Sequence, residues 1–181
     1  MKRMVLTVFG VLAISSFAFA QSQPEIDTAL LAAPAPLKAD ATVVKWKADY
    51  TYDTLKKGSN RLVCFNKSGL AGQQPFSIEC TSIANLDRVA QNLKFESEPD
   101  RMKRQAALDA AEANGTRAKP EYGSVWYHVM GKDQASARNH MTIAVPGATT
   151  ATTGLPDNPK IGGVWIMNAG TSTAHLMTPG E

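Results

Sequence analysis

The three histidines of the chain, His128, His140 and His175, all lie in its last third, and each has a methionine one or two residues away. In an extended strand, residues i and i+2 point to the same side, so His128 and Met130 share a face, as do His175 and Met177. Imidazole and thioether groups together suit copper, and imidazole alone also suits zinc. The pattern therefore predicts a copper or zinc site built from these five residues.

The same residues have a purely structural interpretation. Methionine commonly fills gaps in hydrophobic cores, and Trp126, Trp165 and Ile166 lie near the histidines in the sequence, where they are typical of core positions. On this interpretation the histidines lie at strand ends and bond to the backbone. The chain then needs no cofactor, and copper or zinc is the alternative.

Signatures of well-known enzyme classes are absent from the sequence. The chain contains no Gly-x-Ser-x-Gly, no Ser-x-x-Lys set, no His-Glu-x-x-His and no phosphate-binding loop. A small hydrolase with a histidine base is a weaker alternative, since it needs a histidine beside a carboxylate such as Asp53, Asp133 or Asp157. No catalytic residue is assigned.

A non-enzymatic binding or structural module of the bacterial envelope is the leading interpretation. Residues 146–163 are rich in Thr, Ala, Gly and Pro, and loops of this length in compact domains are often functional. With Pro156 in this loop, the aromatic residues Tyr122, Trp126 and Trp165 form a candidate recognition surface. Its expected partner is an envelope protein or a glycan.

The N-terminus predicts export. Lys2 and Arg3 precede an apolar stretch that ends near Phe17, and Ala18-Phe19-Ala20 has the small-x-small pattern that signal peptidase cleaves. We therefore expect residues 1–20 to be a signal peptide that is cleaved after Ala20. The mature protein would then be periplasmic or extracellular.

The charge of the chain argues against a nucleic-acid partner, and its hydropathy argues against a transmembrane segment in the mature protein. The chain has 19 Lys and Arg, 16 Asp and Glu, and a formal net charge of +3. The signal peptide contains two of the basic residues and no acidic one, so the mature chain is nearly neutral and has no general attraction for nucleic acid. After cleavage, no apolar run is long enough for a transmembrane segment.

Cys64 and Cys80 are the only cysteines. An even number of cysteines in an exported protein is typical of a structural disulfide. In the chain-entropy model, a bridge around a loop of about 15 residues stabilises the fold by roughly 3 kcal/mol. A redox or metal-thiolate pair is the alternative, but the Cys-x-x-Cys spacing is missing.

The elements that must position these residues form one α+β domain. Residues 21–37 predict a helix, with Pro24 in its first turn, and a Pro-rich connector; residues 38–181 predict the globular domain. Apolar residues at spacings of three and four predict a helix that Thr81 or Ser82 caps. A run rich in Ala, Arg, Lys and Glu predicts a second helix, which begins at Pro99 and Asp100 and ends at Asn114-Gly115. Strand patterns occur at 42–47, 50–55, 61–65, 76–80, 122–130, 140–145, 164–167 and 174–177. We expect a single domain in which two helices cover an antiparallel sheet that contains one disulfide.

Several short runs resemble a family of uncharacterised exported bacterial proteins of unknown function. They are Ala41-Thr42-Val43-Val44 with Trp46, Leu55 with Gly58-Ser59-Asn60 and Cys64, Gly154-Leu155-Pro156, residues 162–167, Gly170-Thr171, and residues 174–177 with Pro179. The resemblance spans residues 38–179, except for the Ala-, Arg- and Lys-rich helix. It implies export and a single domain, without a mechanism. It also favours His140 and His175 over His128, because it places both among its motif positions.

Overall fold

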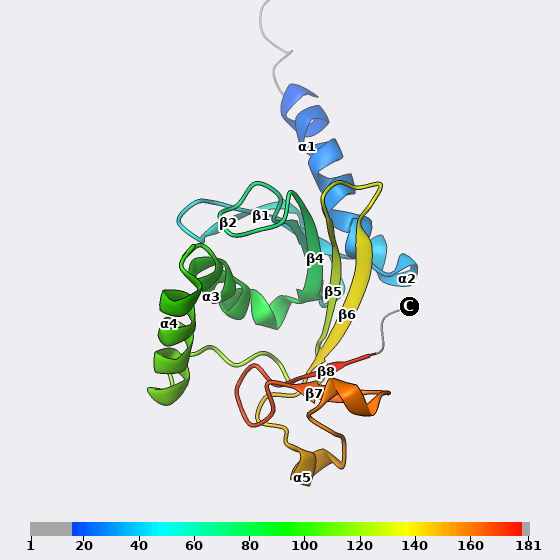
Figure 1. Ribbon diagram of the computed structural model, residues 1–181. Helices are drawn as coiled ribbons and strands as arrows, with labels where there is room; N and C mark the ends of the chain where they lie inside the picture. The colour runs from blue at the N-terminus through cyan, green and yellow to red at the C-terminus, as the bar shows by residue number, and fades with distance from the viewer. Residues whose placement is uncertain (1–15, 179–181) are drawn as a thin grey trace, which may run out of the picture.

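Eight strands form a single mixed sheet in the computed structural model, which describes the backbone of residues 16–178 and the side chains of residues 23–178 (Figure 1). The strand order is β2-β1-β3-β4-β5-β6-β8-β7. The strands are β1 Thr42–Trp46, β2 Tyr52–Lys56, β3 Leu62–Asn66, β4 Phe76–Ser82, β5 Val125–Gly131, β6 Arg138–Ala144, β7 Trp165–Met167 and β8 His175–Met177. All eight strands expected from the sequence are therefore confirmed.

Helices precede the first strand and lie between β4 and β5 and between β6 and β7. They are α1 Ser16–Ala29, α2 Ala35–Lys38, α3 Leu86–Glu96, α4 Arg101–Ala113 and α5 Thr150–Thr153, with 3-10 turns η1 Leu30–Ala32, η2 Ile83–Asn85 and η3 Pro159–Ile161. The Asp100 side chain accepts hydrogen bonds from the N–H groups of Met102 and Lys103 and so caps α4, at the start that the sequence predicts for this helix. Among the described residues, no helix has both the length and the hydropathy needed to cross a membrane.

The prediction of a wholly antiparallel sheet is wrong at one pair of strands. β1 and β3 are parallel, while β2 pairs with the other edge of β1. The connection from β2 to β3 crosses the start of β1, where the N–H groups of Ser59 and Asn60 donate to the Asp40 carbonyl. A Cβ at Gly58 would lie 2.1 Å from that carbonyl oxygen, so the crossing needs glycine.

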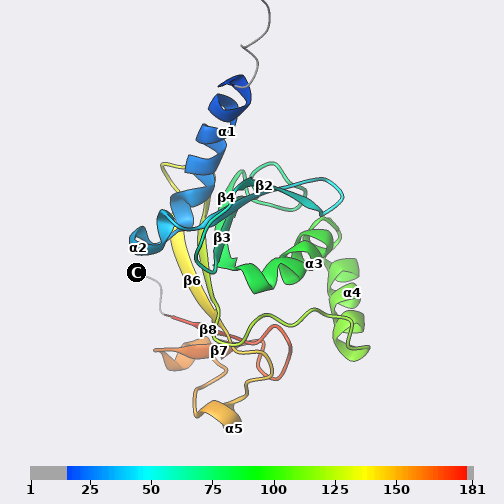
Figure 2. The same ribbon diagram turned by 180° about the vertical axis from the view of Figure 1, so that it is seen from behind.

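The prediction of two covering helices is also wrong in detail. One face of the sheet is covered by α1 and η1, whose Ile26, Ala29 and Leu30 pack on the core residues of β1, β3 and β4. The other face is covered by α3, and α4 packs on the outer side of α3 (Figure 2). The amphipathic face of α3 is apolar enough to bind the sheet, whereas the alanine-rich α4 is mostly exposed.

The N-terminal helix differs from its predicted bounds. It begins at Ser16 rather than near residue 22, so Pro24 lies inside the helix and not in its first turn. Residues 1–15, which include most of the expected signal peptide, lie outside the described residues. The signal peptide and its cleavage after Ala20 stay predictions.

The predicted disulfide is confirmed. Cys64 and Cys80 are directly opposite each other in the antiparallel β3–β4 pair, and their sulfur atoms are 2.10 Å apart. Both residues are fully buried beneath α1, where the Ala29 carbonyl lies 3.8 Å from Cys80 Sγ. The bond therefore joins two neighbouring strands inside the core.

Candidate functional site

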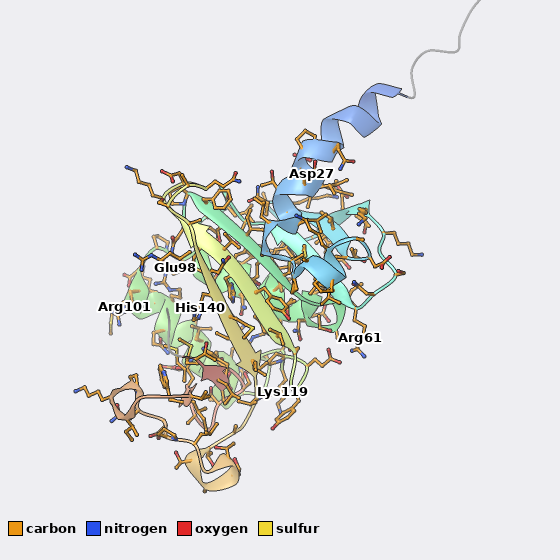
Figure 3. All side chains as sticks on the ribbon, turned by 90° about the vertical axis from the view of Figure 1, so that its right-hand side faces the viewer. Asp27, Arg61, Glu98, Arg101, Lys119 and His140 are labelled. Carbon is orange, nitrogen blue, oxygen red and sulfur yellow. A yellow bond between two sulfur atoms is a disulfide. The ribbon has the colours of Figure 1, made fainter. Side chains whose placement is uncertain are left out.

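Strand registers place the three histidines on one face of the sheet. His128 on β5 pairs directly with His140 on β6, and Ala144 on β6 pairs with His175 on β8. Because side chains alternate along each strand, all three project toward the side of the sheet covered by α3. Met130 and Met177 lie on the same side by the same alternation. We call these five residues the histidine face; Figure 3 labels His140 within it.

A cavity lies between this face and α3. It has a volume of about 260 Å³, and its lining includes Arg88 and Asn92 of α3. From the sheet, it is lined by residues that include Trp126, His128, Met130, His140 and His175. Met177 shares the face but is not among the residues that line this cavity. The lining of this cavity therefore includes all three imidazoles and one methionine.

The closest approach between imidazoles is that of His128 and His140. Their ring centroids are 5.9 Å apart and the ring planes are inclined by 31°. In the part of the chain that the structure describes, no three His, Cys, Asp or Glu side chains are grouped closely enough to hold a metal ion. The Met130 thioether lines the same cavity and is a ligand group of another type.

A buried ion pair adjoins the histidine face and was not singled out from the sequence. Glu79 on β4 is 3% exposed, and its Oε2 accepts a hydrogen bond of 2.6 Å from Lys67 Nζ. The same oxygen lies 3.2 Å from His128 Nδ1. A cavity of about 400 Å³, lined by Lys67, Glu79, His128 and Met130 among others, joins the pair to the histidine face.

Glu79 stays ionised in spite of its burial. Burial raises the pKa of its carboxyl group, but the charge of Lys67 and the contact with His128 outweigh this effect and lower the pKa to about 2. Lys67 responds in the opposite sense: burial alone would lower its pKa, but the charges of Glu79 and Glu96 raise it. Both members of the pair are therefore charged at neutral pH.

The alternation of residues in β4 could have singled out Glu79 from the sequence. In β4, alternation separates the buried Ile78 and Cys80 from the polar Ser77, Glu79 and Thr81, which lie on the other face. That polar side is nevertheless buried. A charged residue at a strand position that the next elements cover needs a partner, and the sequence did not show that Lys67 supplies it.

The other two histidines are held in different surroundings. The Nδ1 atom of His175 lies 2.7 Å from the Thr173 carbonyl, so a proton on Nδ1 can donate to it. Burial lowers the pKa of His140, and the charges of His128 and His175 lower it further. At neutral pH the His140 ring is therefore mostly neutral, which is the form that binds metals.

Arg88 links α3 to the segment before His175. Its guanidinium donates hydrogen bonds to the Ala118 carbonyl at 2.6 Å, to Ser172 Oγ at 3.0 Å and to Thr173 Oγ1 at 2.7 Å. Burial, with the nearby charge of Arg117, lowers its pKa to about 10, so it remains charged at neutral pH. These hydrogen bonds hold α3, which lines one side of the cavity, next to the segment that leads into β8 and His175.

The residues of the candidate recognition surface lie in different environments. Trp126 is buried and lines the cavity, whereas Tyr122 is 68% exposed. Trp165 and Pro156 are half-buried and close together, since the Pro156 carbonyl accepts a hydrogen bond from Ile166 N–H. The recognition surface stays a prediction, and its four residues do not share one cavity.

The hydrolase interpretation gains no support from the contacts. The carboxylate that contacts a histidine is Glu79, while Asp53 pairs with Lys47 and Asp133 with Ser136. Asp157, the third carboxylate considered, is exposed. Within residues 23–178, no serine, threonine or cysteine side chain is hydrogen-bonded to a histidine. The hydrolase therefore stays an untested alternative, and these contacts do not point to an activated nucleophile among the described residues.

Comparison of the chain with protein-family models, with curated proteins and with solved structures finds no match in any of the three. The resemblance to exported bacterial proteins therefore stays a prediction. The structure is that of an α+β protein with a cavity lined by histidines.

Acid is expected to remove about 3 kcal/mol of stability through Glu79. The carboxyl pKa is about 2 in the folded protein against an ordinary value of 4.5, so the unfolded chain binds the proton more tightly. The contribution is complete above about pH 5 and is lost as the pH falls toward about 2. Lys67 adds no slope here, because it is protonated in both states.

Urea unfolding near pH 6 and near pH 3 measures this loss. The double variant Lys67→Met/Glu79→Gln lacks the titrating group, whereas the surface carboxylates respond alike in both proteins. The wild type should therefore lose more stability in acid than the double variant. Equal losses would show that Glu79 titrates normally.

Proposed function

We propose that the protein is an exported metal-binding protein that holds one copper ion, as Cu(I), on the histidine face. The ligands are one ring nitrogen each from His128 and His140 and the Sδ atom of Met130. Zinc is the second metal to test, because it accepts imidazole but has less preference for a thioether. The observation that supports the proposal is the direct pairing of two histidines from neighbouring strands.

The separation of the two rings suits a shared ion. Metal–imidazole bonds are about 2.0 Å long, which puts each ring centroid about 3 Å from the metal. Two imidazoles that share one ion then have centroids up to about 6 Å apart, and the distance between His128 and His140 is 5.9 Å. The centroid separation is therefore within the range that two imidazoles sharing one ion can have.

The chemistry of the surroundings favours a soft cation. The low pKa of His140 keeps its lone pair available, and Met130 supplies sulfur next to His128 in the same cavity. Thioether ligands select Cu(I) over harder ions. His175 lines the same cavity but is not grouped with the other two histidines closely enough to complete a three-histidine site.

Competition titration of the chelator-treated protein tests the proposal. Cu(I), kept reduced by ascorbate, is expected to bind with one ion per chain. The variants His128→Ala and His140→Ala should each weaken the affinity at least about 100-fold, which is the upper end of what outer-shell changes cost. Met130→Ala should weaken Cu(I) binding more than Zn²⁺ binding.

Met102→Ala is the matched control for the methionine, because Met102 lies on α4 and is 78% exposed. It should leave both affinities unchanged. Copper binding that survives both histidine variants would place the ion elsewhere. A protein that binds neither metal would contradict the proposal and favour the binding module with an envelope protein or glycan partner.

A further inference from the structure

The ion pair beside the histidine face is more than a structural contact. Lys67 and Glu79 have side chains that are 11% and 4% exposed, and their charged atoms are 2.6 Å apart. Removing two charges from water costs several kcal/mol each, so a buried ion pair rarely stabilises a fold more than apolar side chains of similar size. The pair therefore calls for a role beyond stability, and its third contact, His128, indicates one.

The contact between Glu79 and His128 involves one particular ring nitrogen, Nδ1. His128 Nδ1 is buried and makes no well-aligned hydrogen bond, but Glu79 Oε2 is 3.2 Å away. An unprotonated Nδ1 would direct its lone pair at an ionised carboxylate inside the protein, where such repulsion is strong. A proton on Nδ1 converts this repulsion into attraction, even when the angle is not ideal.

The opposite nitrogen then becomes the free ligand atom. β4 and β6 lie on opposite sides of β5, so a ring whose Nδ1 faces Glu79 on β4 has its Nε2 turned away from that strand. His140 lies on β6, on the far side. Metal-binding histidines usually donate their other ring N–H to a carboxylate or a carbonyl, which fixes the ring and its tautomer.

We propose that Glu79 and Lys67 are positioning residues that hold His128 in its Nδ1–H tautomer, with the Nε2 lone pair free for the metal. This inference rests on the proposed function for its purpose but not for its test. Glu79 fixes the proton on Nδ1. Lys67 donates a hydrogen bond of 2.6 Å to Glu79 Oε2 and so holds this oxygen beside His128 Nδ1.

Nuclear magnetic resonance of the metal-free protein tests the tautomer directly. In a long-range ¹H–¹⁵N spectrum of the wild type near pH 8, His128 should show a protonated Nδ1 and an unprotonated Nε2. In Lys67→Met/Glu79→Gln, which leaves no buried charge unpaired, the ring should shift to a mixture of both tautomers. The Cu(I) affinity should fall about 10- to 100-fold, as for other outer-shell changes.

The exposed pair Lys45–Glu25 supplies a matched control. Its charged atoms are also 2.6 Å apart, but its side chains are 57% and 46% exposed. The variant Lys45→Met/Glu25→Gln makes the same two substitutions away from the histidines, and it should change neither the His128 spectrum nor the affinity.

Two results would overturn the inference: a wild-type His128 protonated on Nε2, or an unchanged tautomer in Lys67→Met/Glu79→Gln. Because the spectrum is recorded without metal, the two proposals fail separately. A fixed Nδ1–H tautomer in a protein that binds no copper would contradict only the proposed function. Tight copper binding with a mixed tautomer would contradict only the positioning role.

Discussion

The Lys67→Met variant is expected to lose about 3–5 kcal/mol of its free energy of unfolding at neutral pH. The substitution leaves the Glu79 carboxylate, which is 3% exposed, without the ammonium group 2.6 Å away. The contact of His128 Nδ1 with the same Glu79 oxygen cannot replace the lost ion pair, because its distance of 3.2 Å is longer than the 2.6 Å to Lys67. Urea unfolding followed by circular dichroism measures the loss.

The double variant Lys67→Met/Glu79→Gln should regain most of this stability, since it removes both charges together. The control is Lys45→Met, which breaks the exposed pair with Glu25 and should cost no more than about 1 kcal/mol. A loss below about 1 kcal/mol in Lys67→Met would mean that the two buried charges do not depend on each other.

The second large effect is expected at Phe65, and its origin is packing. Phe65 is fully buried and belongs to the core cluster that includes Val89 and Leu93 of α3. Its ring meets Trp46 edge to face, with centroids 5.8 Å apart and planes at 89°. Phe65→Ala leaves a cavity between the sheet and α3, and should cost about 3–5 kcal/mol.

Thermal unfolding and urea unfolding measure this loss, and Phe76→Ala is the matched control. Phe76 begins β4 but is only partly buried, so truncating it should cost clearly less than truncating Phe65. Equal losses at the two positions would show that α3 does not depend on the packing of Phe65. The comparison thus measures how firmly the helix above the histidine face is attached.

Local patterns in the sequence were sufficient for most of the secondary structure. Runs of β-branched and aromatic residues between turn residues predict all eight strands, and spacings of three and four from Ile83 to Leu93 predict η2 and α3. These signals are local, because hydrophobic periodicity and capping depend on neighbours in the chain. The pairing of Cys64 with Cys80 could also be predicted from the sequence, because there is no other cysteine.

The pairing of segments that are distant in the chain could not be predicted from the sequence as well. β3 can pair with β1 in parallel because β2 occupies the opposite edge of β1. The chain reaches that free edge by crossing the start of β1 at Gly58. In the same way, the sequence did not show that α1 would cover one face of the sheet. Such choices depend on how much apolar surface each arrangement buries, which no local pattern records.

By itself, the sequence determined which side chains could act as ligands, namely three histidines with methionines beside two of them at i+2. That spacing assigns His128 and Met130 to one side of a strand, since side chains alternate with a period of two. Only the tertiary structure decided that three strands present their histidines to the same cavity, and that Glu79 and Lys67 lie next to them. The reason is that strand register is set by pairing across the sheet, where a shift of one residue would turn each histidine to the opposite face.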